Sequence, residues 1–163
     1  MIGARNGKIL LVLGVMAGIA QVFAGVVMYL AGVYFAPWSM GVSLLVLLSC
    51  IVVGTRWYTT HCLNGEITYV QALGVGIVIS VSTGLVYAIY NLISISWFYP
   101  NFLDNMVRAR IAQTSAHQQS AESFATLRSQ ITAPKIAIAN FIRLSIMGSI
   151  LSLVTALFLK RKR

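Results

Sequence analysis

The residue in this sequence most suited to binding a ligand or partner is Arg143, which lies inside a long apolar segment near the C-terminus. A charged side chain at the middle of a bilayer costs about 2.5–3.5 kcal/mol on insertion scales. Two interpretations stay open: Arg143 is an interface anchor whose side chain snorkels to the headgroups, or it contacts an anionic lipid or a partner protein. Asn140, one turn outward, and Asn91, in an earlier apolar segment, are its possible hydrogen-bond partners.

A second polar side chain inside an apolar segment is Gln21. Within a membrane such a residue is expected to hydrogen-bond to another helix, a contact worth about 0.6–2 kcal/mol. The alternative is a polar track, formed by Gln21, Asn91, Asn140 and Arg143, along which a substrate or lipid is handled. The aromatic residues Trp97 and Phe102 flank the end of the third apolar segment, and we expect them to contact lipid or a partner.

Residues for catalysis or metal binding are sparse. His61 and Cys62 are adjacent but have no matching pair elsewhere, and zinc requires three or four suitably spaced ligands. The only acids are Glu66, Asp104 and Glu122, and none lies within an apolar segment. A proton-coupled transporter generally needs an intramembrane group that can change its charge. We therefore expect no catalytic residue, cofactor or metal, and a protein that is not an enzyme.

The composition places these residues in a membrane protein. Charged residues make up 9% of the chain and hydrophobic residues 58%, whereas globular domains carry roughly 25% charged residues. Spanning helices need about 20 apolar residues. The sequence predicts an all-α integral membrane protein, one domain over residues 1–163. The expected spans are 9–35, 39–55, 72–98 and 136–159, with a tight turn at 36–39, a polar turn at 56–64 and an external loop at 99–134.

The external loop is expected to contain helices. Apolar residues recur at helical spacing from Asn101 to about Ala112, which predicts an amphipathic helix. Phe124, Leu127 and Ile131 predict a second, shorter one. The first of these helices, within residues 99–112, would lie on the outer leaflet or on a partner protein.

The basic residues indicate the orientation in the membrane. Of the 12 Lys and Arg residues, seven flank the spans on the side of the two termini and four lie on the long loop. By the positive-inside rule both termini are cytoplasmic. The four C-terminal residues, Lys160, Arg161, Lys162 and Arg163, are expected to meet anionic headgroups. The formal net charge of +9 is therefore attributed to membrane topology, and no nucleic-acid partner is expected.

Small residues recur along three of the expected spans. In lipid, where helices gain little from hydrophobic burial, small residues allow close helix approach. We expect them to pack helices, within the bundle or against a partner. The principal candidates are Gly14, Gly18, Gly84, Gly148 and Ser152.

Two stretches carry a family resemblance. They are Gly65-Glu66-Ile67-Thr68-Tyr69-Val70-Gln71-Ala72-Leu73 and Tyr99-Pro100-Asn101-Phe102-Leu103-Asp104. With a last span that ends in lysine and arginine, the chain resembles a Bacteroidota family of small four-span inner-membrane proteins catalogued as a domain of unknown function. The resemblance implies a bacterial inner membrane and a four-helix layout, and it brings no catalytic or binding residue.

The function expected from these observations is that of a non-enzymatic accessory or structural subunit of a larger inner-membrane complex. Such a subunit would contact lipid and other membrane subunits, or associate with itself. The alternative is a small carrier or lipid-handling protein that uses the polar track.

Overall fold

The computed structural model describes residues 4–98, 101–113, 129 and 131–159. Its elements are α1 (Ala4–Leu30), α2 (Ser39–Cys62), α3 (Tyr69–Ile93), η1 (Ser94–Phe98), α4 (Phe102–Gln113) and α6 (Ala133–Leu159). Among these described residues, four helical segments are long and apolar enough to cross a membrane: α1, α2, α3 together with most of η1, and α6. The expected all-α, four-span architecture is therefore confirmed.

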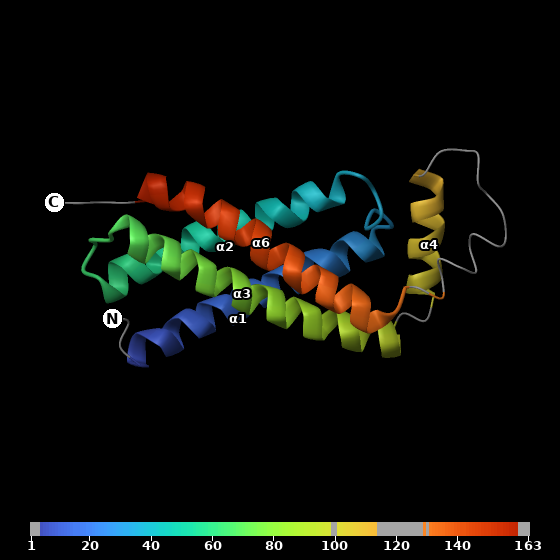
Figure 1. The fold of residues 1–163 in the computed structure, drawn as a ribbon, viewed down its shortest axis with the longest axis horizontal. Helices are drawn as coiled ribbons and strands as arrows, with labels where there is room; N and C mark the ends of the chain where they lie inside the picture. The colour runs from blue at the N-terminus through green and yellow to red at the C-terminus, as the bar shows by residue number, and fades with distance from the viewer. Residues whose placement is uncertain (1–3, 99–100, 114–128, 130, 160–163) are drawn as a thin grey trace.

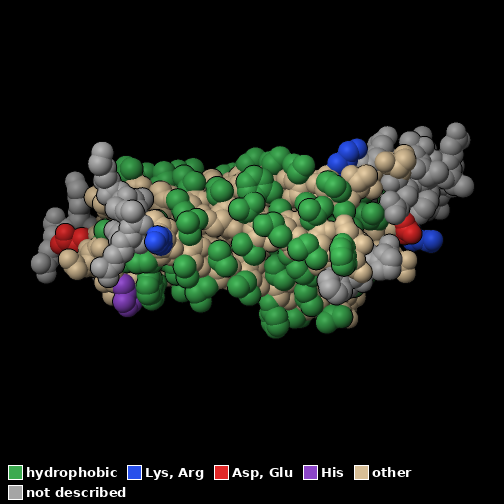
Figure 2. All heavy atoms as spheres, turned by 90° about the horizontal axis from the view of Figure 1, so that it is seen from below, with side chains coloured by type: hydrophobic (Ala, Val, Ile, Leu, Met, Phe, Trp, Pro, Cys, Tyr) green, Lys and Arg blue, Asp and Glu red, His purple; other side chains and the backbone are tan. Residues whose placement is uncertain are grey.

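The central helix of the bundle is α3. It packs most extensively along α6 and α1, whereas α2 contacts α1, α6 and α3 over shorter stretches. The four long helices follow the long axis of the molecule, and α1 begins at the end where α6 finishes (Figure 1). At the opposite end α4 lies across this axis. Hydrophobic side chains cover the middle of the face seen in Figure 2, with charged side chains toward both ends, as expected of a surface that faces lipid.

The first spanning helix ends earlier than predicted, at Leu30 rather than near residue 35. The amide of Val33 donates to the carbonyl of Met28, and the amide of Gly32 to that of Tyr29, each at 3.0 Å. Gly32 has a φ of 72°. These features form a Schellman C-cap, in which glycine adopts the left-handed conformation without a Cβ clash. The expected end of the first span is thus wrong, because Gly32 stops the helix.

The second helix, by contrast, is longer than predicted and continues to Cys62 through most of the expected polar turn. The hydroxyls of Thr59 and Thr60 donate to carbonyls four residues earlier, at 2.7 and 3.0 Å. These polar side chains make their hydrogen bonds to carbonyls of the same helix, so the helix continues through them. The expected end at residue 55 is wrong, and the chain turns at Asn64 and Gly65, with φ values of 51° and 87°.

The third spanning helix begins with a capping box. The Thr68 hydroxyl accepts from the amide of Gln71 at 3.4 Å, and the Gln71 side-chain oxygen accepts from the amide of Thr68 at 3.0 Å. This reciprocal pair satisfies two amides that lack helical partners. The helix therefore begins at Tyr69, three residues before the expected span. At its other end it passes into the π-helical turn η1.

Small residues form the seam between α3 and α6. The facing pairs are Gly76 with Ser152, Ser80 with Gly148, and Gly84 with Ser145. A Cβ added at Gly84 would lie 3.1 Å from the Ser145 hydroxyl and 3.2 Å from the carbonyl oxygen of Phe141. The side chain at each of these positions therefore sets how closely the two helices approach.

A second close approach joins α1 to α3. Gly14 faces Ser82, and a Cβ added at Gly18 would lie 2.6 Å from the Cβ of Val86. The Thr83 hydroxyl donates to the carbonyl of Gly14 at 3.3 Å. The five small residues singled out from the sequence thus all lie at helix contacts inside the chain.

The short helix α4 is anchored by Phe102, which is 5% exposed. Its ring centroid lies 5.9 Å from that of Tyr29 and 5.5 Å from those of Tyr34 and Phe35. The expectation that Phe102 faces lipid or a partner is therefore wrong, because the aromatic cluster at the end of α1 buries the ring. Trp97, in contrast, is 84% exposed and remains available for such a contact.

Some expectations concern residues outside the described part of the chain. These are the second loop helix around Phe124 and Leu127, and the basic run Lys160–Arg163. Ile131, the last apolar residue of that predicted helix, is described and buried, in a cluster with Phe102 and Ile136. The loop therefore packs against the bundle at this point.

Candidate functional site

Arg143 lines a recess of about 140 Å³ near the end of the bundle where α4 lies. The polar side chains of its lining come from four parts of the chain. They are Asn140 and Arg143 of α6, Ser39 and Ser43 of α2, Tyr34 of the α1–α2 turn, and Tyr87 of α3. One cation among hydroxyl and amide groups suits an anionic or strongly polar ligand group. We call this set of residues the Arg143 recess.

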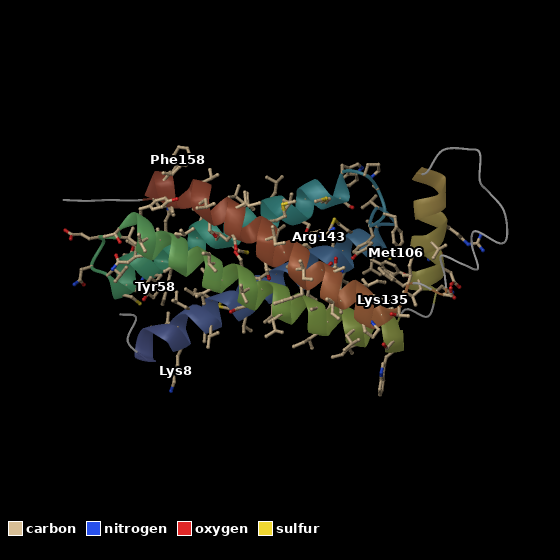
Figure 3. The ribbon with its side chains drawn as sticks, viewed as in Figure 1. Lys8, Tyr58, Met106, Lys135, Arg143 and Phe158 are labelled. Atoms are coloured by element: carbon tan, nitrogen blue, oxygen red, sulfur yellow. The ribbon has the colours of Figure 1, made fainter. Side chains whose placement is uncertain are left out.

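The arginine lies well inside the span. It is ten residues beyond Ala133 and sixteen before Leu159, or about 15 Å and 24 Å along a helix. Figure 3 likewise shows Arg143 partway along α6, away from Lys135 at the helix start. Within the described residues the exposed Arg143 side chain has no ion pair and no hydrogen bond. A guanidinium at this depth requires a polar or anionic partner, so its charge is open to one from elsewhere.

Gln21 connects to the Arg143 recess through Ser43. The Gln21 side chain is 1% exposed and its amide nitrogen donates to the Ser43 hydroxyl, which joins α1 to α2. This is the interhelical hydrogen bond expected from the sequence. The side-chain oxygen of Gln21 is buried and has no hydrogen-bond partner within the described residues. The side-chain oxygen of Gln21 can therefore accept a further hydrogen bond next to Ser43 of the recess.

Asn91 lies apart from the arginine. Its amide nitrogen donates to the carbonyl of Tyr87, one turn earlier in the same helix, at 2.9 Å. It lines a smaller space of about 20 Å³, and Tyr34 and Tyr87 line both this space and the Arg143 recess. Phe102 also lines both spaces, and together these three rings form the wall between them. The expected hydrogen bond between Asn91 and Arg143 is wrong, because Asn91 is satisfied by its own helix behind this wall.

The two tyrosines form a hydroxyl pair, with their oxygen atoms 3.3 Å apart. Tyr34 lies in the turn between the first two spans. Burial, and the neighbouring hydroxyl of Tyr87, raise the pKa of the Tyr34 phenol above its usual range. Tyr34 therefore stays protonated at physiological pH and keeps a hydroxyl hydrogen to donate within this pair or into the recess.

The other titratable residues noted in the sequence lie elsewhere. His61 is at the far end of α2, where its ring stacks on Trp57 with centroids 4.5 Å apart. Within the described part of the chain, no three His, Cys, Asp or Glu side chains lie close enough to share a metal ion.

A family model described as "Protein of unknown function (DUF4199)" matches residues 13–161, which include nearly all of the four spans. The chain belongs to the DUF4199 family. No curated protein matches the chain, and no solved structure matches it. The resemblance inferred from the sequence, to a family catalogued by unknown function, agrees with this assignment.

In this DUF4199 protein, four polar residues of the recess were missed by sequence reasoning: Tyr34, Ser39, Ser43 and Tyr87. The available signal was a hydroxyl within or next to an apolar run, because such groups require partners in lipid. Tyr34 and Ser39 lie in or next to the tight turn expected at 36–39, and Ser43 and Tyr87 lie within the expected apolar spans, so none of them stood out in the sequence. The sequence therefore predicted Arg143 and Asn140 but not the side chains that complete their recess.

Proposed function

We propose that this DUF4199 protein is a non-enzymatic accessory subunit of a larger complex in the inner membrane of a bacterium of the Bacteroidota. Its docking point would be the Arg143 recess. The observation that carries the proposal is the intramembrane arginine whose charge has no counterpart among the described residues. A partner helix with a carboxylate at the same depth would supply that counterpart.

The packing of the bundle favours a partner that docks at the polar Arg143 recess over one that docks on a stripe of small residues. Gly14 and Gly18 of α1, Gly76 and Gly84 of α3 and Gly148 of α6 already face neighbouring helices of this chain, so these positions are not free for a partner. The recess, in contrast, is lined by Met40 of α2, which is 39% exposed, and by Arg143 of α6, which follows the exposed Ile142. A partner helix against Met40 and Ile142 would place its acidic residue near Arg143.

The experiment is site-specific photo-crosslinking in native membranes. A photoreactive phenylalanine analogue at Met40 should give one adduct of defined mass, whereas the same analogue at Ile77, exposed on α3, is the control. The Met40 adduct should disappear with Arg143→Leu and persist in part with Arg143→Lys, which keeps the charge. An adduct that Arg143→Leu leaves unchanged would contradict the proposal.

A second candidate function, the handling of a polar lipid or small solute, is favoured by one observation. Gln21 bonds to Ser43, and Ser43 lines the same recess as Asn140 and Arg143, so three of the four predicted track residues are contiguous. In this case Arg143 would hold the phosphate of a lipid headgroup. Native mass spectrometry would then detect a phospholipid that Arg143→Leu removes, and the Met40 analogue would crosslink to lipid rather than to protein.

A further inference from the structure

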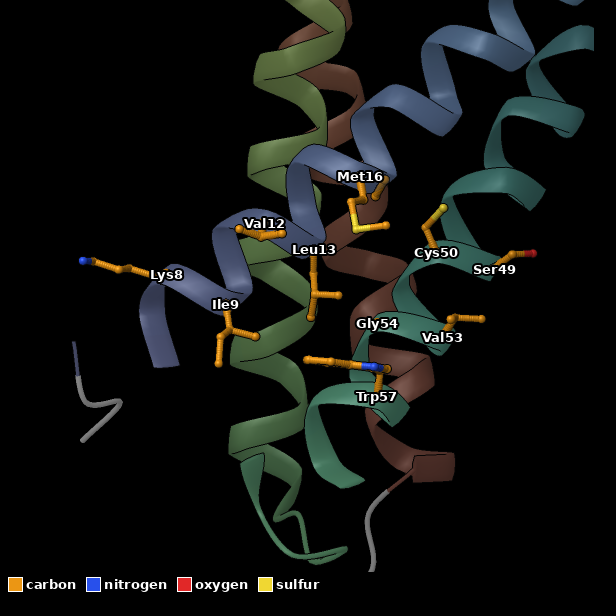
Figure 4. Close-up of a pocket in the computed structure, with 11 residues that line it drawn as sticks. Lys8, Ile9, Val12, Leu13, Met16, Ser49, Cys50, Val53, Gly54 and Trp57 are labelled. Atoms are coloured by element: carbon orange, nitrogen blue, oxygen red, sulfur yellow. The ribbon is translucent and has the colours of Figure 1, made fainter. Parts of the chain in front are cut away.

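A large apolar groove lies between α1 and α2 at the end where the chain begins and ends (Figure 4). Its volume is about 720 Å³. The lining includes Val12, Leu13 and Met16 of α1, with Cys50, Val53 and Trp57 of α2 facing them. We call this space the α1–α2 groove. Apart from Lys8 at one end and Ser49, its lining offers no charged or hydroxyl side chain.

At this end of the bundle both helices pack closely against α3, which leaves a space between them. Gly14 brings α1 against Ser82 of α3, and Gly54 brings α2 against Ile79, whose Cδ1 would lie 2.8 Å from an added Cβ. The side chains that line the groove come from α1 and α2 (Figure 4). The open side lies at the level of the spanning helices, where lipid surrounds the protein.

We propose that the α1–α2 groove binds one acyl chain of an anionic phospholipid from the leaflet on the side of the chain termini. The groove is about 12 Å long from Lys8 to Met16. A helix is about 10 Å across. An acyl chain is thinner and matches the apolar lining, so lipid fits better than a partner helix or a second copy of this chain.

The charges at the mouth select the headgroup. Lys8 lies at the rim and its side chain extends away from the groove, so its ammonium would reach the headgroup layer while its stem lies along apolar surface (Figure 4). Arg56 is exposed and neighbours Val53 on the helix surface, three residues on. Trp57, 43% exposed, has the amphipathic ring typical of the headgroup boundary. Two cations beside one lipid-sized groove favour an anionic headgroup.

The test uses Trp57 as a reporter of the bound lipid. The other two tryptophans are replaced in Trp38→Phe/Trp97→Phe, and the protein is reconstituted in vesicles of phosphatidylcholine with either brominated phosphatidylcholine or brominated phosphatidylglycerol. Bromine quenches a tryptophan that it contacts. The expected result is that brominated phosphatidylglycerol competes for the site near Trp57 about thirtyfold better, the effect of two cations at a membrane surface at about 1 kcal/mol each.

Two variants, each with a matched control, test separately the binding of the acyl chain and the preference for the headgroup. Val12→Phe fills the groove and should reduce quenching of Trp57 by either lipid, whereas Val15→Phe, also exposed on α1 but not part of the groove lining, should not. Lys8→Gln should lower the preference for the anionic lipid about fivefold, because Arg56 remains, whereas Lys135→Gln, which removes the same charge at the other end of the bundle (Figure 3), should keep it. Equal quenching by both brominated lipids would overturn the proposal, as would protection of Trp57 from both. These outcomes do not depend on Arg143.

Discussion

At the scale of single residues, the hydrogen bond between Gln21 and Ser43 is the clearest polar contact between spans. We predict that a double-mutant cycle of Gln21→Leu and Ser43→Ala yields a coupling energy of about 0.6–1.7 kcal/mol, the range of interhelical hydrogen bonds in membranes. The cycle is measured by unfolding the reconstituted protein in mixed micelles of increasing denaturing detergent. Additive effects of the two substitutions would contradict the bond.

The sequence predicted a contact of a single residue correctly where a polar side chain lies inside an apolar segment. A polar group inside an apolar run, as at Gln21, requires a partner, and this requirement can be read without a structure. The identity of the partner could not be read. Asn91 and Arg143 were matched by depth alone, but a helix also has a rotational position. Three aromatic rings stand between the residues, and Asn91 uses a carbonyl of its own helix instead.

At the scale of helices, the seam between α3 and α6 makes a sharp prediction about glycine. A Cβ at Gly148 would overlap the side chain of Ser80, so Gly148→Ala should destabilise the bundle by about 1–3 kcal/mol through forced separation. Gly74→Ala is the matched control, because no neighbouring atom lies within 4 Å of its added Cβ. Equal stability of the two variants in the same unfolding assay would show that the seam does not limit helix approach.

The docking of α4 makes a second prediction at this scale. Phe102→Ala removes the ring that fills the aromatic cluster, and large-to-small substitutions of buried aromatics cost about 3–5 kcal/mol. Limited proteolysis should then cleave α4 much faster, while the spanning helices stay intact. Trp97→Ala, on a nearly fully exposed side chain, should leave the cleavage rate within about twofold.

Helix existence was predictable because apolar length alone specifies a span, but helix ends were not. The end of α1 depends on one glycine in the left-handed conformation, and several glycines precede Gly32 within the helix. The end of α2 depends on hydroxyls that bond to their own helix, as Thr59 does. The start of α3 did carry a readable signal, the Thr68–Gln71 capping box.

At the scale of the whole molecule, the distribution of Lys and Arg predicts the orientation. The test introduces single cysteines into a protein that carries Cys50→Ser and Cys62→Ser. Glu66→Cys places one in the α2–α3 turn, and Asn105→Cys places one on α4 at the other end of the bundle. With cytoplasmic termini, a membrane-impermeant maleimide should label Asn105→Cys in spheroplasts and Glu66→Cys only after lysis. The reverse labelling would invert the topology.

Whether the protein forms a complex with another protein is also a question about the whole molecule. The measurement is the mass of the particle that the wild-type chain forms when it is extracted from its own membranes in mild detergent, compared with Arg143→Leu. We predict a particle well above 17.7 kDa that contains a second protein, and loss of that protein in Arg143→Leu with the fold intact. A wild-type chain that elutes as a lone 17.7 kDa protein, or a complex that Arg143→Leu leaves unchanged, would contradict the proposed function.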